Sequence, residues 1–327
     1  MTTPDTAGNV LTVQGPVDPN DLGITITHEH LLIDMTVDPP DPSDKKWQCF
    51  VKQRFGEGKR EVAQYANAGG GTIVDTSNIG IHRNPLALAE LSRDTGVHIV
   101  MGGGYHFEPY HPEGFSSRSI DDIADEIIRD VQVGLDESGI RCGIIGEVGC
   151  SWPWTDVEKR SVSAAVAAQQ TTGAPLLIHP GLDQKAPVEI AEFIDREGGD
   201  LTRTVMSHVD LRIAERSILH ELAATGIYIE FDTFGFESAP QQPSPEPPTP
   251  TDPERIGMVE WLIEEEFTEQ IVLAHDLYTR ERRREFGGHG IQHIPTTVVD
   301  QMKLQGITQA QIDTMLIENP RRVLTFV

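Results

Sequence analysis

Short runs of apolar and β-branched residues recur along the chain, and each is followed by a longer segment of helical composition. Each run has the length of a single strand, about 4 to 8 residues, and glycine or proline often precedes it. We expect eight strands, at residues 23–27, 71–76, 97–102, 143–147, 175–179, 204–208, 227–232 and 270–276.

The segments between these runs carry apolar residues at helical spacing. In the segment 120–135, for example, Ile123, Ile127, Val131 and Leu135 share one face of a helix. Similar patterns predict helices at 158–171, 211–224 and 254–267.

Eight strands that alternate with helices over about 250 residues are typical of an α/β fold of the (β/α)8 TIM barrel type. The alternative is a doubly wound open sheet. No glycine-rich GxGxxG fingerprint follows the first strand, which weakens that alternative. We therefore expect one domain over residues 1–327, with an N-terminal extension at 1–21 and a proline-rich loop at 238–253.

Two loops follow strand ends, where barrel enzymes build their active sites. The segment 38–46 follows the first strand, and the proline-rich loop 238–253 follows the seventh. We expect the second to act as a lid over the site, the alternative being a solvated linker.

Acidic residues outnumber basic ones 51 to 26, which gives a net charge of −25. Such a surface repels nucleic acids and anionic membranes, so neither is expected as a partner. The N-terminus lacks a signal pattern, and a cytoplasmic protein is expected. Three widely spaced cysteines, Cys49, Cys142 and Cys150, fit small buried side chains better than disulfides or a thiolate metal site.

The chemistry is concentrated at the strand ends. His28 and His30 end the first expected strand, and residues two apart on a strand point to the same face. A single HxH pair is common by chance, but four other strand ends carry potential metal ligands: Glu147, His179, His208 and Asp276. In a barrel these ends converge on one mouth. Imidazole and carboxylate ligands suit Zn, Mn, Co, Fe or Ni, and zinc is the default.

Six ligands are too many for one open catalytic ion, but they fit two ions that share a bridge. The carboxylate of Glu147 is the natural bridge, because each of its oxygens can bind one ion. Two ions about 3.5–4 Å apart acidify a shared water and polarise the bond to be cleaved. The sequence therefore predicts a hydrolase with two divalent metal ions per chain.

Several motifs resemble the phosphotriesterase family of the amidohydrolase superfamily, and most closely its phosphotriesterase-related proteins. These motifs are LGITITHEHL at 22–31, GIIGEVGCSWP at 143–153, HPG at 179–181, SHVD at 207–210, AHD at 274–276 and GGHG at 287–290. The resemblance runs from about Val10 to Val327. It implies the barrel, a binuclear metal centre and a homodimer.

The resemblance also implies roles for the ligands. His28, His30 and Asp276 would hold the more buried ion, His179 and His208 the more exposed one, and Glu147 would bridge them. The best-known enzymes of the family bridge their metals with a carboxylated lysine, whereas this chain has a glutamate there. The difference favours amide, ester or lactone substrates over phosphotriesters.

The expected function is hydrolysis of a small carbonyl substrate, an N-acyl amide, carboxylic ester or lactone, by a metal-bridging hydroxide. Asp276 would be the catalytic group that accepts the hydroxide proton. The alternatives are a phosphotriesterase and, in another class, a ligand-binding barrel without catalysis. All six ligands are present, which speaks against the last.

Candidate substrate contacts rest on weaker signals. Tyr105 follows a glycine-rich strand end, and Arg280 lies among four arginines after the eighth strand, where it could hold an anionic group of a small-molecule substrate. His289 lies in the next loop. A packed aromatic ring, a salt-bridge patch and a structural hydrogen bond are the respective alternatives. Asp210 and Asp232 are expected to orient ligating imidazoles.

Overall fold

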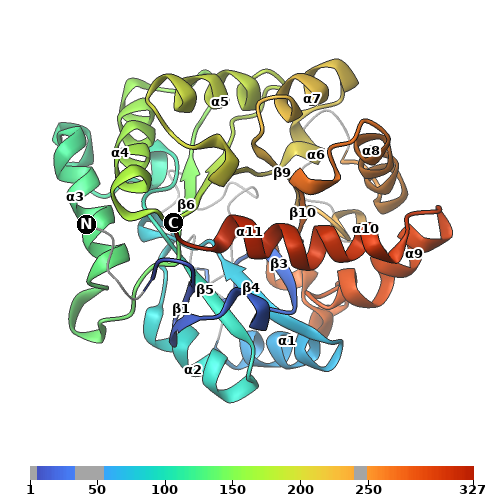
Figure 1. The fold of residues 1–327 in the computed structure, drawn as a ribbon. Coiled ribbons are helices and arrows are strands. Elements are labelled where there is room, and N and C mark those ends of the chain that lie inside the picture. The colour runs from blue at the N-terminus through green and yellow to red at the C-terminus, as the bar shows by residue number, and fades with distance from the viewer. Residues whose placement is uncertain (1–5, 34–54, 239–248) are drawn as a thin grey trace, which may run out of the picture.

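The computed structural model describes residues 6–33, 55–238 and 249–327. At its centre lie eight parallel strands, each hydrogen-bonded to the next in chain order from β3 to β10 (Figure 1). They are β3 (Ile24–Glu29), β4 (Gly70–Asp75), β5 (His98–Gly103), β6 (Ile144–Gly149), β7 (Leu176–His179), β8 (Thr204–Met206), β9 (Tyr228–Phe231) and β10 (Ile271–Leu273). All eight predicted strands and the barrel class are confirmed.

The barrel is nearly closed between its first and last strands. There the Asp276 backbone N–H, just beyond β10, donates to the carbonyl of His28 in β3 at 3.1 Å. The Thr27 hydroxyl donates to the carbonyl of Leu273 at 3.4 Å. This junction between β3 and β10, called the seam below, contains residues of the predicted metal site.

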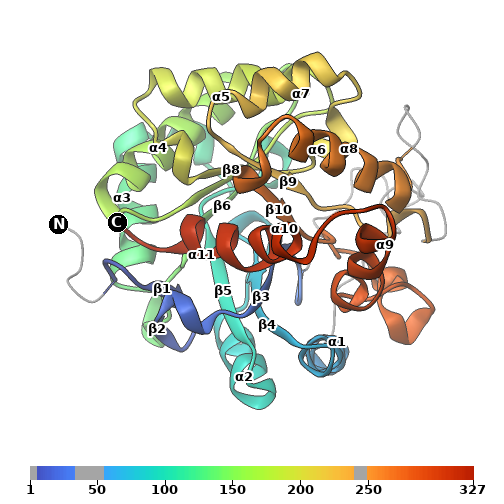
Figure 2. The same cartoon turned by 45° about the vertical axis from the view of Figure 1, so that its right-hand side comes forward.

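Helices surround the strands, as the two views in Figures 1 and 2 show. They are α1 (Phe55–Asn67), α2 (Pro85–Thr95), α3 (Ile120–Gln132), α4 (Asp156–Thr172), α5 (Ala186–Arg196), α6 (Val209–Arg212), α7 (Arg216–Ala223), α8 (Asp252–Glu264), α9 (Val299–Leu304), α10 (Gln309–Asp313) and α11 (Asn319–Leu324). Of the predicted helices, 120–135, 158–171 and 254–267 are confirmed as α3, α4 and α8 with shifted ends.

The predicted helix 211–224 is wrong as one element. The chain forms the short helix α6 and then α7, and between them Ile213 is extended, with φ −111° and ψ 107°. The short α6 keeps Asp210 buried against Thr233 and Arg255, while α7 packs separately against α5. Tertiary hydrogen bonds thus outweigh the continuous helical pattern of the segment.

The end of the barrel at which the strands begin is covered by elements far apart in sequence. A hairpin of β1 (Val10–Thr12) and β2 (Gly15–Val17) lies beside α11 (Figure 1). Val10 and Val323 pack in one buried cluster with strand side chains such as Val74, Ile144 and Val205. The hairpin gives part of the expected extension 1–21 a structural role that the sequence pattern did not indicate.

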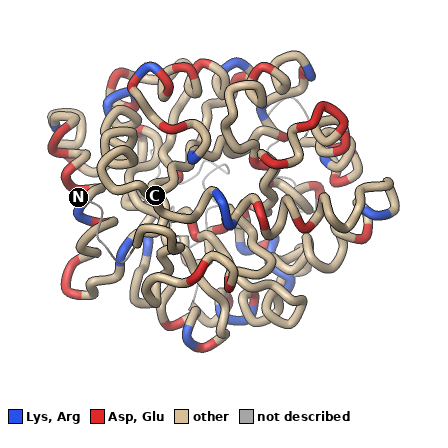
Figure 3. Tube along the Cα trace, in the orientation of Figure 1, with Lys and Arg blue, Asp and Glu red and all other residues tan. Residues whose placement is uncertain are grey.

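Several predictions concern the surface and the loops. Acidic residues are distributed over the outer helices (Figure 3). Cys142 and Cys150 are buried free thiols, as expected. Cys49, the loop 38–46 and residues 239–248 of the proline-rich loop lie outside the described residues. Among the helices that are described, none is long and apolar enough to cross a bilayer.

Candidate metal centre

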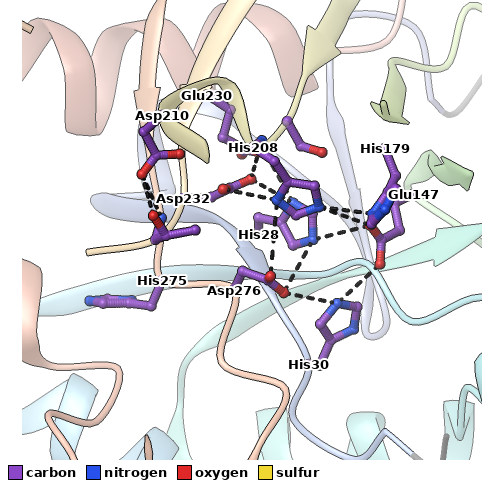
Figure 4. Close-up of polar contacts among 12 residues, drawn as sticks. His28, His30, Glu147, His179, His208, Asp210, Glu230, Asp232, His275 and Asp276 are labelled. Atoms are coloured by element: carbon purple, nitrogen blue, oxygen red, sulfur yellow. Dashed lines mark hydrogen bonds and ion pairs between the residues drawn. The ribbon is translucent and has the colours of Figure 1, made fainter. Parts of the chain in front are cut away.

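The six side chains predicted as metal ligands meet in one buried cluster at the strand ends (Figure 4). On the seam side, Nε2 of His30 lies 3.1 Å from Oε1 of Glu147 and 3.4 Å from Oδ1 of Asp276. His28 completes this side, with Nε2 3.8 Å from the same Asp276 oxygen. We call His28, His30 and Asp276 the seam half of the cluster.

Two imidazoles form the other side, called the mouth half. Nδ1 of His179 lies 2.8 Å from Oε2 of Glu147. Nε2 of His208 lies 2.8 Å from Nδ1 of His179 and 3.6 Å from Oε2 of Glu147. The carboxylate of Glu147 therefore lies between the halves, with Oε1 beside His30 and Oε2 beside His179.

The donor set fits divalent cations. Nε2 of His28 is fully buried and has no hydrogen-bond partner in the described part of the chain, although it lies 3.6 Å from Glu147. A buried polar atom without a partner is costly, and a bound cation would satisfy it. Ligand atoms of His28, His30 and Asp276 all lie within 4.8 Å of one another, and so do those of His28, Glu147 and His208.

Two of the six residues have left-handed backbones. His208 has φ 54° and Asp276 has φ 46°, a region that is uncommon for residues other than glycine, although Asn, Asp and His adopt it more often than the rest. Hydrogen bonds maintain both conformations. The His208 N–H donates to Oδ2 of Asp232 at 2.9 Å, and the Asp276 N–H donates to His28.

The electrostatics of the cluster favour cations. Burial opposes ionisation of Glu147, but the surrounding imidazoles outweigh it and hold the pKa of this carboxyl well below its usual range. The pKa of Asp276 is lowered too, again against burial, by a hydrogen bond from His30 and by nearby imidazoles. Both carboxylates are therefore ionised at neutral pH.

Carboxylates behind the cluster orient its imidazoles. Asp232 accepts from Nδ1 of His208 at 3.0 Å and lies 3.3 Å from Nδ1 of His28, the role predicted for it. Glu230, two residues earlier on β9, lies 2.9 Å from Nδ1 of His28. Asp210 instead accepts from Thr233 and from Nε of Arg255 at 2.8 Å, so its expected contact with an imidazole is not formed.

Glu29, the central residue of the HxH motif, contacts the segment on either side of Asp276. Its Oε1 accepts from the backbone N–H of His275 at 2.9 Å and from Nδ1 of His275 at 2.6 Å. Its Oε2 accepts from the Leu277 N–H at 3.0 Å. Because strand residues alternate, Glu29 points away from the cluster and ties β3 to the end of β10. Figure 4 shows that His275 likewise points away.

Glu29, Glu230 and His275 were not predicted from the sequence as parts of the site. The signal for Glu230 was present, because Glu230 and Asp232 stand two apart on one strand, like His28 and His30. Glu29 carried no comparable signal, since its partners lie about 250 residues away in the chain.

The predicted substrate contacts have other partners. The Tyr105 hydroxyl accepts from Nη1 of Arg118 at 2.7 Å. Nη2 of Arg280 donates to Oε1 of Glu57 at 2.8 Å. His289 is buried, and its ring stacks on His275 with centroids 5.6 Å apart. No described contact joins these three residues to the cluster, and substrate roles for them stay predictions.

His106, next to Tyr105, does face the cluster. Its Nδ1 lies 3.9 Å from Oε1 of Glu147, and its ring meets that of His179 edge to face, with centroids 4.9 Å apart. Burial and the neighbouring imidazoles outweigh the attraction of Glu147 and lower the pKa of His106 to about 3, so the ring is neutral at pH 7.

Comparisons with known proteins identify the family of the chain. A model of the phosphotriesterase family matches residues 8–324. An N-acetyltaurine hydrolase of Danio rerio is 39% identical over 343 residues, covering 98% of each chain. A phosphotriesterase-related protein of Nematostella vectensis is 40% identical over 348 residues, covering 98% of this chain and 99% of its own. Among solved structures, a resiniferatoxin-binding protein of Rhodobacter sphaeroides matches with a TM-score of 0.91 at 29% identity, covering 99% of this chain and 97% of its own.

Proposed function

The chain belongs to the phosphotriesterase family, and on that premise we propose that it is a two-metal hydrolase that cleaves the amide bond of a small N-acylated amine with an anionic group. N-acetyltaurine is the substrate type named for its relatives. The observation that carries the proposal is the Glu147 carboxylate, which lies between the two imidazole groups with one oxygen toward each.

The two halves of the cluster would each hold one ion. His28, His30 and Asp276 would hold one, His179 and His208 the other, and Glu147 would contact both. When bound, the ions would supply an acidified water and polarise the substrate carbonyl. Zinc remains the default choice for this donor set.

Asp276 would accept the proton released when water attacks the carbonyl. Its ionised carboxylate can take a proton at neutral pH, and it lies 3.4 Å from His30 at the seam. The backbone of the same residue is fixed by its bond to His28 and by Glu29 on the flanking N–H groups. A rigid carboxylate keeps the geometry that general base catalysis needs.

Similarity over almost the whole chain supports an amide substrate. The curated relatives named N-acetyltaurine hydrolase match at 37% to 39% identity over 98% of this chain. Taurine carries a sulfonate, and an anionic group of this kind agrees with the prediction that a cationic side chain such as Arg280 contacts the substrate.

The homodimer and the cytoplasmic location stay predictions.

A hydrolysis screen tests the proposal. Protein loaded with zinc would be given N-acetyltaurine, N-acetyl amino acids, lactones, aryl esters and paraoxon, with chelator-treated protein as the control. We expect amide cleavage to be fastest and to require metal. Preferential cleavage of a lactone or of paraoxon would contradict the substrate class, and full activity without metal would contradict the mechanism.

A substitution tests the role of Asp276. In Asp276→Asn the side chain keeps its shape but loses basicity, so kcat should fall by about 10²–10⁴-fold, as for a general base. Circular dichroism and the metal content of the variant, measured alongside the kinetics, separate loss of the base from loss of the fold or of an ion.

A further inference from the structure

His106 is the one imidazole that faces the cluster without belonging to the six predicted ligands. It follows β5 and is 2% exposed. Its Nδ1 is enclosed and has no hydrogen-bond partner among the residues that the structure describes. A neutral imidazole carries one N–H donor and one acceptor, and a buried ring nitrogen without a partner is costly. The position of Nδ1 therefore calls for a group that residues 6–33, 55–238 and 249–327 do not supply.

The surroundings of His106 show where that group would lie. Nδ1 is nearest to Oε1 of Glu147, at 3.9 Å, which is the oxygen beside His30. The ring itself packs against His179 of the mouth half. His106 thus spans the two halves above the bridging carboxylate, next to His179, the ligand whose side chain is 20% exposed. A substrate would approach the cluster from this exposed side.

The chain holds His106 in this place from several directions. Its carbonyl accepts from Nε2 of His111 at 2.6 Å, and the ring of Tyr110 packs against its ring with centroids 5.2 Å apart. Gly149 at the end of β6 is essential to the approach. A Cβ at Gly149 would lie 2.1 Å from the Phe107 nitrogen and 2.6 Å from the carbonyl carbon of His106. Only glycine lets the two segments meet so closely.

We propose that His106 is a further catalytic residue, which donates a hydrogen bond from Nδ1 to the substrate oxygen that becomes negatively charged during hydrolysis. The inference rests on the proposed function and adds a donor to the same site. A fixed, buried donor aimed at developing charge lowers the barrier without reorganisation at the moment of reaction. Ligand atoms of His106, Glu147 and His179 also lie within 4.8 Å of one another, so a seventh ligand is the alternative role, and the zinc content of the His106 variants decides between the two.

The test compares zinc-loaded wild type with His106→Ala and His106→Asn. The asparagine amide can present an N–H near the place of Nδ1, so this variant should keep a hydrogen-bond donor there. His220→Ala, at an exposed imidazole on α7 paired with Glu265, is the matched control. Three quantities are measured: zinc bound per chain, the dissociation constant for inorganic phosphate as an oxyanion probe, and kcat and KM for the best substrate of the screen.

We expect all variants to bind as much zinc as wild type. Phosphate should bind about tenfold or more weakly to His106→Ala, as for the loss of a hydrogen bond to a charged group. It should bind within about threefold of wild type to His106→Asn and His220→Ala. In His106→Ala, kcat should fall about 10²-fold, the loss typical of one oxyanion donor, with KM nearly unchanged.

Other outcomes overturn the proposal. A loss of zinc in His106→Ala would make His106 a ligand. Phosphate that binds wild type and His106→Ala equally, or binds neither, would exclude a donor at this place. Since the zinc and phosphate measurements need no turnover, they decide the role of His106 even if the screen finds no hydrolysis and the proposed function fails.

Discussion

The seam half and the mouth half of the cluster offer similar ligands but are supported in different ways. In the seam half, each residue has a partner behind it: His28 has Glu230, His30 has the Ser77 hydroxyl at 3.0 Å, and Asp276 has the backbone of His28. In the mouth half, His208 is held by Asp232. His179 contacts the bridging Glu147 itself at 2.8 Å, and its ring stacks on Phe107 with centroids 5.8 Å apart.

The difference follows from the place of each half in the barrel. The seam half lies where β3 and β10 meet, so the groups that orient its ligands also close the barrel. The buried Arg282 adds to this, since it donates to the carbonyl of Asp276 at 2.5 Å and to that of His275. The mouth half lies at the ends of β7 and β8, away from this junction, and its His179 side chain is 20% exposed. Stability and metal binding are therefore expected to be coupled at the seam and separable at the mouth.

The largest loss of stability is expected when the side chain of Glu29 is removed. Glu29→Ala would leave two backbone N–H groups and the Nδ1–H of His275 without their buried acceptor, and should lower the free energy of unfolding by about 3–5 kcal/mol. Urea unfolding of the metal-free protein measures it. Glu269→Ala, at a side chain that is 80% exposed, is the control and should change little. An effect of Glu29→Ala below about 1 kcal/mol would mean that the seam does not depend on this carboxylate.

A pair of matched substitutions compares the halves directly. His28→Ala would remove the imidazole that pairs with Glu230 and one of the two imidazoles beside Asp232, and should cost about 2–4 kcal/mol in the metal-free protein. His179→Ala removes a partly exposed ring and should cost about 1 kcal/mol or less. Both variants should lose one bound ion by elemental analysis. Equal losses of stability would remove the distinction between the halves.

Removal of metal with a chelator tests the difference between the two halves without any substitution in the chain. A ligand that binds only the folded state stabilises it by mass action, about 2.7 kcal/mol at a hundredfold excess over its dissociation constant. Stepwise removal of zinc should release the ion of the mouth half first, with a smaller fall in melting temperature than the second ion causes. Simultaneous release of both ions would show that the shared carboxylate of Glu147 couples the binding of the two ions. The different supports of the two halves would then not determine the order of release.

The smallest effect is expected from Arg280→Ala. Its guanidinium pairs with Glu57 and packs over Phe286 at 4.1 Å from the ring centroid, on a partly exposed surface. Stability should change by about 1 kcal/mol or less. If Arg280 also contacts the substrate, KM should rise for anionic substrates and stay unchanged for neutral ones. Unchanged kinetics for both classes would confine Arg280 to its pairing with Glu57.

Local patterns in the sequence predicted the strands and the ligands because both are local properties. Each strand is one apolar run, and each of the six predicted ligands stands at the end of such a run, where a barrel brings all ends together. The period of two along β3 also placed His28 and His30 on one face. These features needed no knowledge of which distant segments meet.

The remaining features depend on contacts between distant segments. The role of Glu29 depends on β10, and that of His106 on Gly149, whose missing side chain admits the loop after β5. The same applies to Arg280, because its partner Glu57 lies 223 residues away. Asp210 stands two residues from His208, but the buried Arg255 attracts its carboxylate instead. Proximity in sequence was therefore a poor guide to the surroundings of the site.

The residues just before the β1–β2 hairpin lie beside the last residues of the chain, and this has a consequence for engineering. Gly8 donates to the carbonyl of Phe326, and Phe326 donates to that of Asn9, each at 2.9 Å. These bonds lie at the end of the barrel where the strands begin, opposite the cluster. The molecule is thus suited to circular permutation: a short peptide can join this pair of neighbours, and new ends can be opened after α9, where Leu304 is 87% exposed.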